Sequence, residues 1–254
     1  MTRVRLDEHT TDELRALLDA GDVAVLVPVG SVEPHGPHLP LGTDTFLSEA
    51  AAARAVARLS ERGARALVAP SVPYGVTEYA SGFAGAVSVP AAALTALLAG
   101  IAARLLADGF AHVCFVNNHL EPAHDAAVRA AIAGLPDGAA SVACPLVRRW
   151  GRTLSDEFKR GNCHAGRYET SLVLAAGREV RDVARALPPL ATSLSEGIAA
   201  GKATFREMGL DRAYTGAPAE ATREEGDALY EKLAEMVATE VLEGLARRAS
   251  SAHT

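Results

Sequence analysis

The chain has 254 residues, of which 49% are hydrophobic and 22% are charged. This length and composition exclude a disordered chain and allow a substantial buried core. Lys and Arg number 25 against 31 Asp and Glu, a formal net charge of −6, so no basic excess favours nucleic acid or an anionic membrane as a partner.

Cysteine usage and the N-terminal segment bear on the compartment. Cys114, Cys144 and Cys163 are widely spaced and odd in number, which fits neither a disulfide framework nor a CxxC zinc site. The first 20 residues lack the apolar core of a signal peptide, and no run approaches the ~20 apolar residues of a membrane span. We therefore expect a cytoplasmic protein that is not membrane-bound.

Short apolar runs alternate with helical stretches along the chain, the pattern of a parallel sheet flanked by helices in an α/β fold. Thr10 and Glu13 form a candidate capping box for a helix that runs through Ala20. We expect one domain over residues 1–254, in which the irregular stretch 187–201 is a surface excursion or an oligomer contact. The pattern predicts strands over 23–29, 66–70, 112–117 and 141–146, and further helices over about 46–60, 91–107, 123–133, 169–176 and 220–249.

Three polar segments follow predicted strands, where open α/β sheets bind their ligands. The first follows Val29 and contains Glu33 and His35, which alternate and so point the same way in an extended segment. Asp44 can return to them if the intervening stretch 39–41 packs into the core. These ligand types suit Zn²⁺ or Mn²⁺. In the alternative interpretation, Asp44 only caps the next helix and the histidine lies on the surface.

The second segment ends the strand at 112–117 and adds an alternating pair, His119 and Glu121. The third contains His164, a candidate proton-transfer group, and Glu169, a candidate ligand or orienting group. The alternatives are a hydrogen-bonded core histidine at 119 and glutamates that favour helix N-termini at 121 and 169. Taken together, the three segments supply enough ligands for two metal ions bridged by Asp44, a site suited to the hydrolysis of an amide-like bond.

Three stretches, GSVEPHGPHLPLGTDT, VNNHLEPAH and HAGRYETS, resemble the signature segments of the creatininase (creatinine amidohydrolase) family in the same order. The resemblance implies a three-layer α/β/α sandwich with a mostly parallel central sheet. It also implies two divalent ions per subunit, Zn²⁺ or Mn²⁺ by preference, and a homo-oligomer, with a hexamer favoured.

The resemblance also implies roles for individual residues. Glu33, Asp44 and His119 match the ligands of one metal, and His35, Asp44 and Glu121 match those of the other. His164 matches the histidine that moves a proton to the leaving nitrogen, and Glu169 matches an acidic residue at the edge of the metals.

The remaining pocket differs from that of creatininase itself. Arg160 and Cys163 stand where aromatic and acidic residues pack on creatinine in the family, and Tyr79 replaces a histidine. Glu78 and Leu120 complete the candidate substrate-binding residues. The basic residues Arg148, Arg149, Arg152, Lys159 and Arg160 surround Trp150 and form either a solvated face or a clamp for a substrate carboxylate.

These observations predict a dinuclear metal-dependent hydrolase in which metal-bound hydroxide attacks a non-peptide C–N bond of a small molecule, with lactams and cyclic ureido or guanidino rings favoured. The HLEP segment weighs against a mycofactocin-type precursor peptidase, which is kept as an alternative together with a formamide deformylase. A metal- or nucleotide-binding module without turnover is the non-enzyme alternative, although the chain has no GxGxxG motif or P-loop.

Overall fold

The computed structural model describes residues 3–251. Its centre is a sheet of four strands in the order β2-β1-β3-β4, in which every neighbouring pair is parallel. The strands are β1 (Val23–Val29), β2 (Arg65–Val68), β3 (His112–Asn117) and β4 (Ala140–Ala143). Every residue of β1 and β3 is buried, as the continuous apolar composition of these runs predicts.

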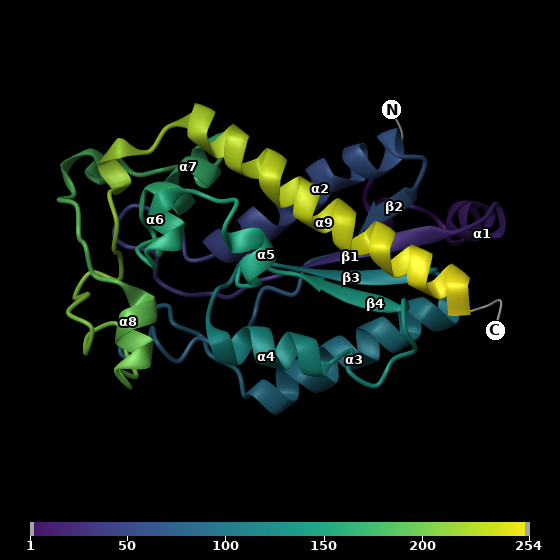
Figure 1. Cartoon of the computed structure of the whole chain (residues 1–254), viewed down its shortest axis with the longest axis horizontal. Coiled ribbons are helices and arrows are strands. Elements are labelled where there is room, and N and C mark those ends of the chain that lie inside the picture. The colour runs from purple at the N-terminus through teal and green to yellow at the C-terminus, as the bar shows by residue number, and fades with distance from the viewer. Residues whose placement is uncertain (1–2, 252–254) are drawn as a thin grey trace.

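Helices cover both faces of the sheet (Figure 1). One face packs against α2 (Thr43–Glu61), α7 (Arg167–Ala175) and the long α9 (Arg223–Ser251), and the other packs against α1 (Thr11–Asp19), α3 (Ala91–Asp108) and α4 (Pro122–Ala130). Strand residues alternate between the two cores: Ala24 and Leu26 contact the first, and Val25 and Val27 the second. The arrangement is the expected three-layer α/β/α sandwich with a parallel sheet.

Short elements gather beyond the carboxyl ends of the strands, at the left of Figure 1. They are α5 (Arg148–Gly151), α6 (Asp156–Lys159) and α8 (Leu194–Ala199), with the 3-10 turns η2 (Asp182–Ala186) and η3 (Pro218–Glu220). A further 3-10 turn, η1 (Leu6–Glu8), precedes α1. The sequence pattern predicts none of these elements, and α8 lies within the stretch expected to be irregular.

Local signals place the longer helices well. Thr10 and Glu13 form the predicted capping box of α1, and α3 begins after Pro90 and ends at Gly109, which adopts a left-handed conformation with φ 110°. The expectation that no run approaches a membrane span is corrected. By length and composition, α3, with a mean hydropathy of 1.6, is long and apolar enough to cross a membrane. In this fold α3 packs on the sheet through Leu94, Leu98 and Ala102.

Candidate metal centre

The candidate site lies where the connections from β1 and β3 diverge to opposite edges of the sheet, the switch point at which parallel sheets bind ligands. The loop after β1 carries Glu33 and His35, and the first turn of α2 carries Asp44. The loop after β3 carries His119, and the segment that leads into α7 carries His164 and Glu169. All of these side chains are buried.

Backbone contacts fold the loop after β1 back onto itself. The Glu33 amide donates to the Leu41 carbonyl at 3.1 Å, so the two ends of the loop meet and Asp44 returns to Glu33. Leu39 is buried in the core as expected, whereas Leu41 is 42% exposed, which corrects the expectation that the whole 39–41 stretch packs inward. Gly36 has a φ of 63°, in the left-handed region, and so allows the loop to turn between Glu33 and Leu41.

His35 lies at the centre of three carboxylates. Its Nδ1 lies 3.1 Å from the Glu33 carbonyl oxygen, which can only accept a hydrogen bond, so Nδ1 carries the proton. Its Nε2 lies 3.1 Å from Asp44 Oδ1, 3.6 Å from Glu169 Oε2 and 3.7 Å from Glu33 Oε1. In the neutral ring, Nε2 therefore presents a lone pair to carboxyl oxygens.

His119 and His164 repeat this division of the ring nitrogens. His119 Nε2 donates to the Val76 carbonyl at 2.7 Å, and its Nδ1 lies 3.1 Å from Asp44 Oδ2 and 3.4 Å from Glu33 Oε1. His164 Nε2 donates to the Pro34 carbonyl at 3.1 Å, and its Nδ1 lies 3.8 Å from Glu33 Oε1. A backbone acceptor on one ring nitrogen is the arrangement that fixes the tautomer of a metal-ligating histidine.

The site needs positive charge. Asp44 Oδ2 is buried and has no hydrogen-bond partner within residues 3–251, although it lies beside the lone pair of His119. Burial lowers the pKa of His35, but Asp44, Glu169 and Glu33 outweigh burial and raise it to about 10. The pKa of His119 is likewise raised well above its usual value by Glu33 and Asp44, against burial. Protons thus take the place that a divalent cation would fill.

Two groups of three ligands share Asp44. Glu33, Asp44 and His119 form one, and His35, Asp44 and Glu169 form the other, with the ligand atoms of each group within 4.8 Å of one another. Asp44 presents Oδ1 to His35 and Oδ2 to His119, as a bridging carboxylate must. The residues present fit a divalent metal centre. A third group, Glu33, His35 and His164, overlaps with both.

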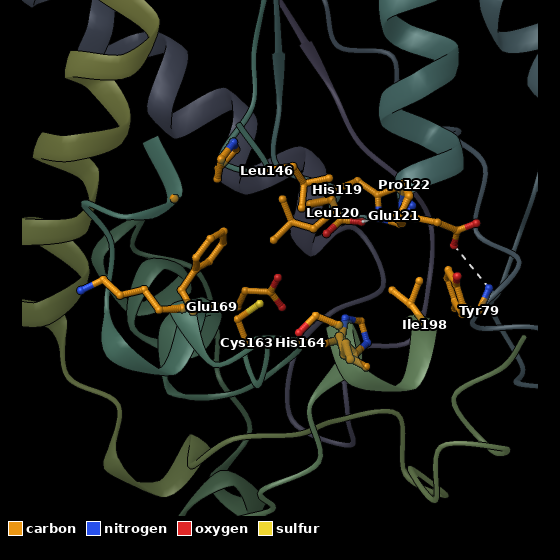
Figure 2. Close-up of a pocket in the computed structure, with 18 of the residues that line it drawn as sticks. Tyr79, His119, Leu120, Glu121, Pro122, Leu146, Cys163, His164, Glu169 and Ile198 are labelled. Atoms are coloured by element: carbon orange, nitrogen blue, oxygen red, sulfur yellow. Dashed lines mark hydrogen bonds and ion pairs between the residues drawn. The ribbon is translucent and has the colours of Figure 1, made fainter. Parts of the chain in front are cut away.

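The two remaining glutamates have different surroundings, and their roles toward a metal stay predictions. Glu169 belongs to a ligand group, and the Ala165 amide holds its Oε2 at 2.6 Å. Glu121 belongs to none of the three groups and instead accepts hydrogen bonds from the amides of Glu78 at 3.1 Å and Tyr79 at 3.3 Å. Figure 2 shows its contact with Tyr79 as a dashed line. Burial raises the pKa of Glu121 to about 7.

The ligand cluster opens into a cavity of about 550 Å³. Of the expected substrate-binding residues, Tyr79, Leu120 and Cys163 line it, and Figure 2 shows Leu120 and Cys163 facing each other across it. Glu78 and Arg160 are not among its lining residues. Glu78 accepts a hydrogen bond from Ser88 Oγ at 2.6 Å, and Arg160 is exposed.

Much of the cavity wall is apolar and comes from segments that the sequence pattern did not single out. Phe205 lies against His164 with ring centroids 4.4 Å apart. The apolar lining residues come from the segment after β4, from α6, from α8 and from the stretch after α8, where the elements are too short to show a hydrophobic period. The unpredicted apolar lining residues are Pro145, Leu146, Phe158, Leu194, Ile198, Phe205 and Met208.

Two further polar residues support the ligands. Thr77 Oγ1 donates to Glu33 Oε2. His124 is fully buried, and its Nδ1 accepts a hydrogen bond from the Val76 amide at 3.3 Å, while the Val76 carbonyl holds His119. The sequence places His124 one helical turn beyond His119, but it does not reveal this connection through the loop after β2.

The sequence model of the Creatininase family, described as creatinine amidohydrolase, matches residues 7–241. The chain belongs to the creatininase family. Its members are hydrolases that act on amide bonds. This finding confirms the resemblance carried by the three sequence segments.

Individual relatives point to different substrates. The mycofactocin precursor peptide peptidase of Mycolicibacterium smegmatis is 35% identical over 221 residues, which cover 84% of this chain and 81% of that protein. The creatinine amidohydrolase of Pseudomonas putida is 32% identical over 123 residues, 46% of this chain and 45% of that protein. The expectation that weighs against a precursor peptidase is not supported by these relatives, because the peptidase matches a larger share of the chain.

Solved creatininases share the fold. A manganese form superimposes with a TM-score of 0.73 at 23% identity, covering 96% of this chain and 99% of the other. A zinc form of a mutant creatininase superimposes with a TM-score of 0.74 at 22% identity and the same coverage. At this identity the likeness establishes the fold.

Proposed function

We propose that this creatininase-family hydrolase uses two divalent ions to cleave an amide bond of a peptide-like substrate with apolar side chains. The observation that carries the proposal is the position of the ligand cluster inside a cavity of about 550 Å³ with a largely apolar wall. A cavity of this size suits a ligand of several residues, whereas a single small ring fills only part of it. The precursor peptide peptidases among its relatives support the same substrate class.

The two ligand groups that share Asp44 would hold the ions. Bound there, Zn²⁺ or Mn²⁺ would polarise the substrate carbonyl and lower the pKa of water. The rings of His35 and His119 need not reorient to bind the ions, because backbone carbonyls already hold them in the required tautomers.

His164 is suited to proton transfer. It lines the cavity, and the Pro34 carbonyl holds its Nε2, so its Nδ1 faces the site beside Glu33. Burial and the neighbouring His35 lower its pKa to about 4, so the ring is neutral at pH 7. A neutral Nδ1 can accept a proton and return it to the leaving nitrogen of the amide.

A small cyclic amide is the second candidate. The alternating pair His119 and Glu121 favours it, because this HxE form resembles that of creatininase itself. Glu121 lines the cavity, so its carboxyl group is available to a small polar ring.

Metal analysis combined with an activity panel tests the proposal. The purified protein is analysed for metals, chelated, reloaded with Zn²⁺ or Mn²⁺, and assayed on apolar N-acyl peptides, creatinine, hydantoins and formamides. We expect peptide hydrolysis that chelation abolishes and metal restores, and its loss together with the metal in Asp44→Ala and His119→Ala. His9→Ala, which removes a histidine outside the site, serves as the control.

Turnover of creatinine alone would favour the second candidate. Peptide hydrolysis by the fully chelated protein would overturn the metal-dependent reaction. Loss of turnover on the whole panel in a metal-loaded protein would favour a binding module.

A further inference from the structure

Two arginines lie on the wall of the cavity that contains the ligand cluster. Arg148 begins α5 and Arg152 follows its last residue, and both line the cavity. We propose that Arg148 and Arg152 bind a carboxylate of the substrate and so determine which amides the enzyme accepts. This inference rests on the proposed function, because it concerns the same cavity.

The geometry of α5 places the two side chains together. Residues four apart lie on the same face of a helix. The Arg152 Nε donates to the Arg148 carbonyl at 3.2 Å, which holds its guanidinium against this turn. Two like charges so placed destabilise a helix unless an anion lies between them. Within residues 3–251, neither guanidinium forms a salt bridge with a carboxylate.

The neighbouring basic residues have different surroundings. Arg149 is paired with Glu243 at 2.9 Å and stacks over the Trp150 ring at 4.3 Å. Lys159 lines the cavity but is paired with Asp156 at 3.2 Å. Arg160 is exposed and does not line the cavity. Arg148 and Arg152 therefore bring two positive charges to the cavity, and no carboxylate within residues 3–251 forms a salt bridge with either.

The remainder of the cavity orients an anionic substrate. The carboxyl groups of Asp44 and Glu169 already face the His35 and His119 rings of the ligand cluster, so the cluster offers no unpaired cation to a substrate carboxylate. Leu146 and Phe158 belong to the apolar wall of the same cavity. An amide that places apolar side chains along this wall can direct its carboxylate to the arginines and its scissile bond to the ligand cluster.

The planar fork of a guanidinium matches a carboxylate, and two forks can hold both oxygens. In a peptide, the carboxylate is either the C-terminal group or an acidic side chain. Both present the same chemistry to Arg148 and Arg152, so the substrate panel must separate them.

Binding to the metal-free protein tests the inference without requiring turnover. N-acetyl-Ala-Leu-Phe is compared by calorimetry as the free acid, as the C-terminal carboxamide, and as a carboxamide with Asp in place of Ala. We expect the free acid to bind about tenfold or more tightly than the plain carboxamide. A preference for the Asp-containing peptide would instead identify a side-chain carboxylate as the recognised group.

Variants that remove a single charge identify the residues responsible for the preference for the free acid over the carboxamide. Arg148→Gln and Arg152→Gln are expected to lower the acid-to-amide preference at least roughly threefold each and to abolish it together. Arg160→Gln removes the same charge from the same segment and should retain the full preference. All three arginines are exposed, so the variants should remain folded, which thermal unfolding checks.

Equal binding of acids and amides to the parent protein would overturn the inference, as would no measurable binding of any peptide. So would a preference that survives the double substitution. A clear acid preference without hydrolysis of any peptide by the metal-loaded enzyme would instead overturn the proposed peptide hydrolysis and leave the carboxylate site standing.

Discussion

At the scale of single residues, each site histidine directs one ring nitrogen to the backbone and the other to the carboxylates of the ligand cluster. His35, His119 and His164 each donate one N–H to a backbone carbonyl, of Glu33, Val76 and Pro34. The other nitrogen faces carboxylates. Because the acceptors belong to the backbone, the tautomers are set by the course of the chain, and the ligands are oriented before any ion binds.

Glu121 and Glu169 give the first prediction. Glu169 shares a ligand group with His35 and Asp44, whereas two backbone amides hold Glu121. Glu169→Gln should therefore weaken the binding of one of the two proposed ions by roughly 100-fold or more, while Glu121→Gln should retain both. Metal titration of the two isosteric variants measures this difference, and the reverse ranking would restore Glu121 as the ligand.

Gly75 gives a second prediction about the support of His119. A Cβ at this position would lie 2.4 Å from His124 Nδ1 and 2.8 Å from the Gly30 carbonyl oxygen. Gly75→Ala should shift the adjacent Val76, which binds both His124 and His119, and weaken metal binding by about 10- to 100-fold. Gly134→Ala, where a Cβ meets nothing within 4 Å, should bind metal normally. Equal affinities in the two variants would show that the Val76 contact does not orient His119.

The sequence indicates candidate ligand types, whereas the grouping of these ligands depends on the fold. Glu33, His35 and Asp44 were predictable because one loop, bounded by a strand and a helix, contains all three. Whether Glu121 or Glu169 completes the second set depends on the direction in which the loop after β3 leaves the sheet, which no short-range pattern encodes. The contributions of Val76 and Phe205 depend entirely on tertiary packing.

At the scale of elements, the strongest sequence signals are long apolar runs with clear ends. β1 and β3 have the predicted bounds, whereas the predicted strand over 141–146 ends at Ala143, because the chain turns away into α5. Helices of four to six residues, such as α5 and α8, contain too few turns to establish a hydrophobic period. These short helices shape the cavity, so the sequence predicts the scaffold better than the pocket.

Two glycines within helices, Gly100 and Gly244, should respond in opposite ways to substitution by alanine. In α9, a Cβ at Gly244 would lie 2.2 Å from His112 Cε1, so this helix depends on a close approach to β3. In α3, Gly100 is exposed and a Cβ there meets nothing within 4 Å. Gly100→Ala should stabilise the protein by roughly 0.5–1 kcal/mol through helix propensity.

Gly244→Ala gains the same propensity but should destabilise the protein by a net 1–2 kcal/mol or so, since overpacking a buried contact costs more. Urea unfolding of both variants measures the two signs. Stabilisation by Gly244→Ala would mean that α9 can move away from His112 without loss.

At the scale of the whole molecule, the two ends of the sheet differ in role: one carries the candidate site and the other carries a structural contact. The carboxyl ends of the strands carry the buried charges of the site, and the opposite end carries a contact that joins three elements. There His112 of β3 lies 2.8 Å from both the Gly138 carbonyl oxygen and Ser141 Oγ, and its ring packs against Gly244 of α9. This end has no part in the proposed chemistry, so its contribution to stability can be measured separately.

His112 predicts how stability changes with pH in the metal-free protein. Burial lowers its pKa from 6.5 to about 4, and Arg247 and Arg248 act in the same direction. The unfolded chain therefore binds this proton first on acidification, so the stability that neutral His112 contributes is complete above pH 6.5 and is lost as the pH falls toward 4. The loss should approach about 1.4 kcal/mol per pH unit in that range. His112→Asn should be less stable at pH 8 but should lose stability less steeply, so the difference between the two proteins narrows on acidification. Urea unfolding in the presence of a chelator, between pH 8 and pH 5, measures both curves, and parallel curves would show that His112 does not titrate with the fold.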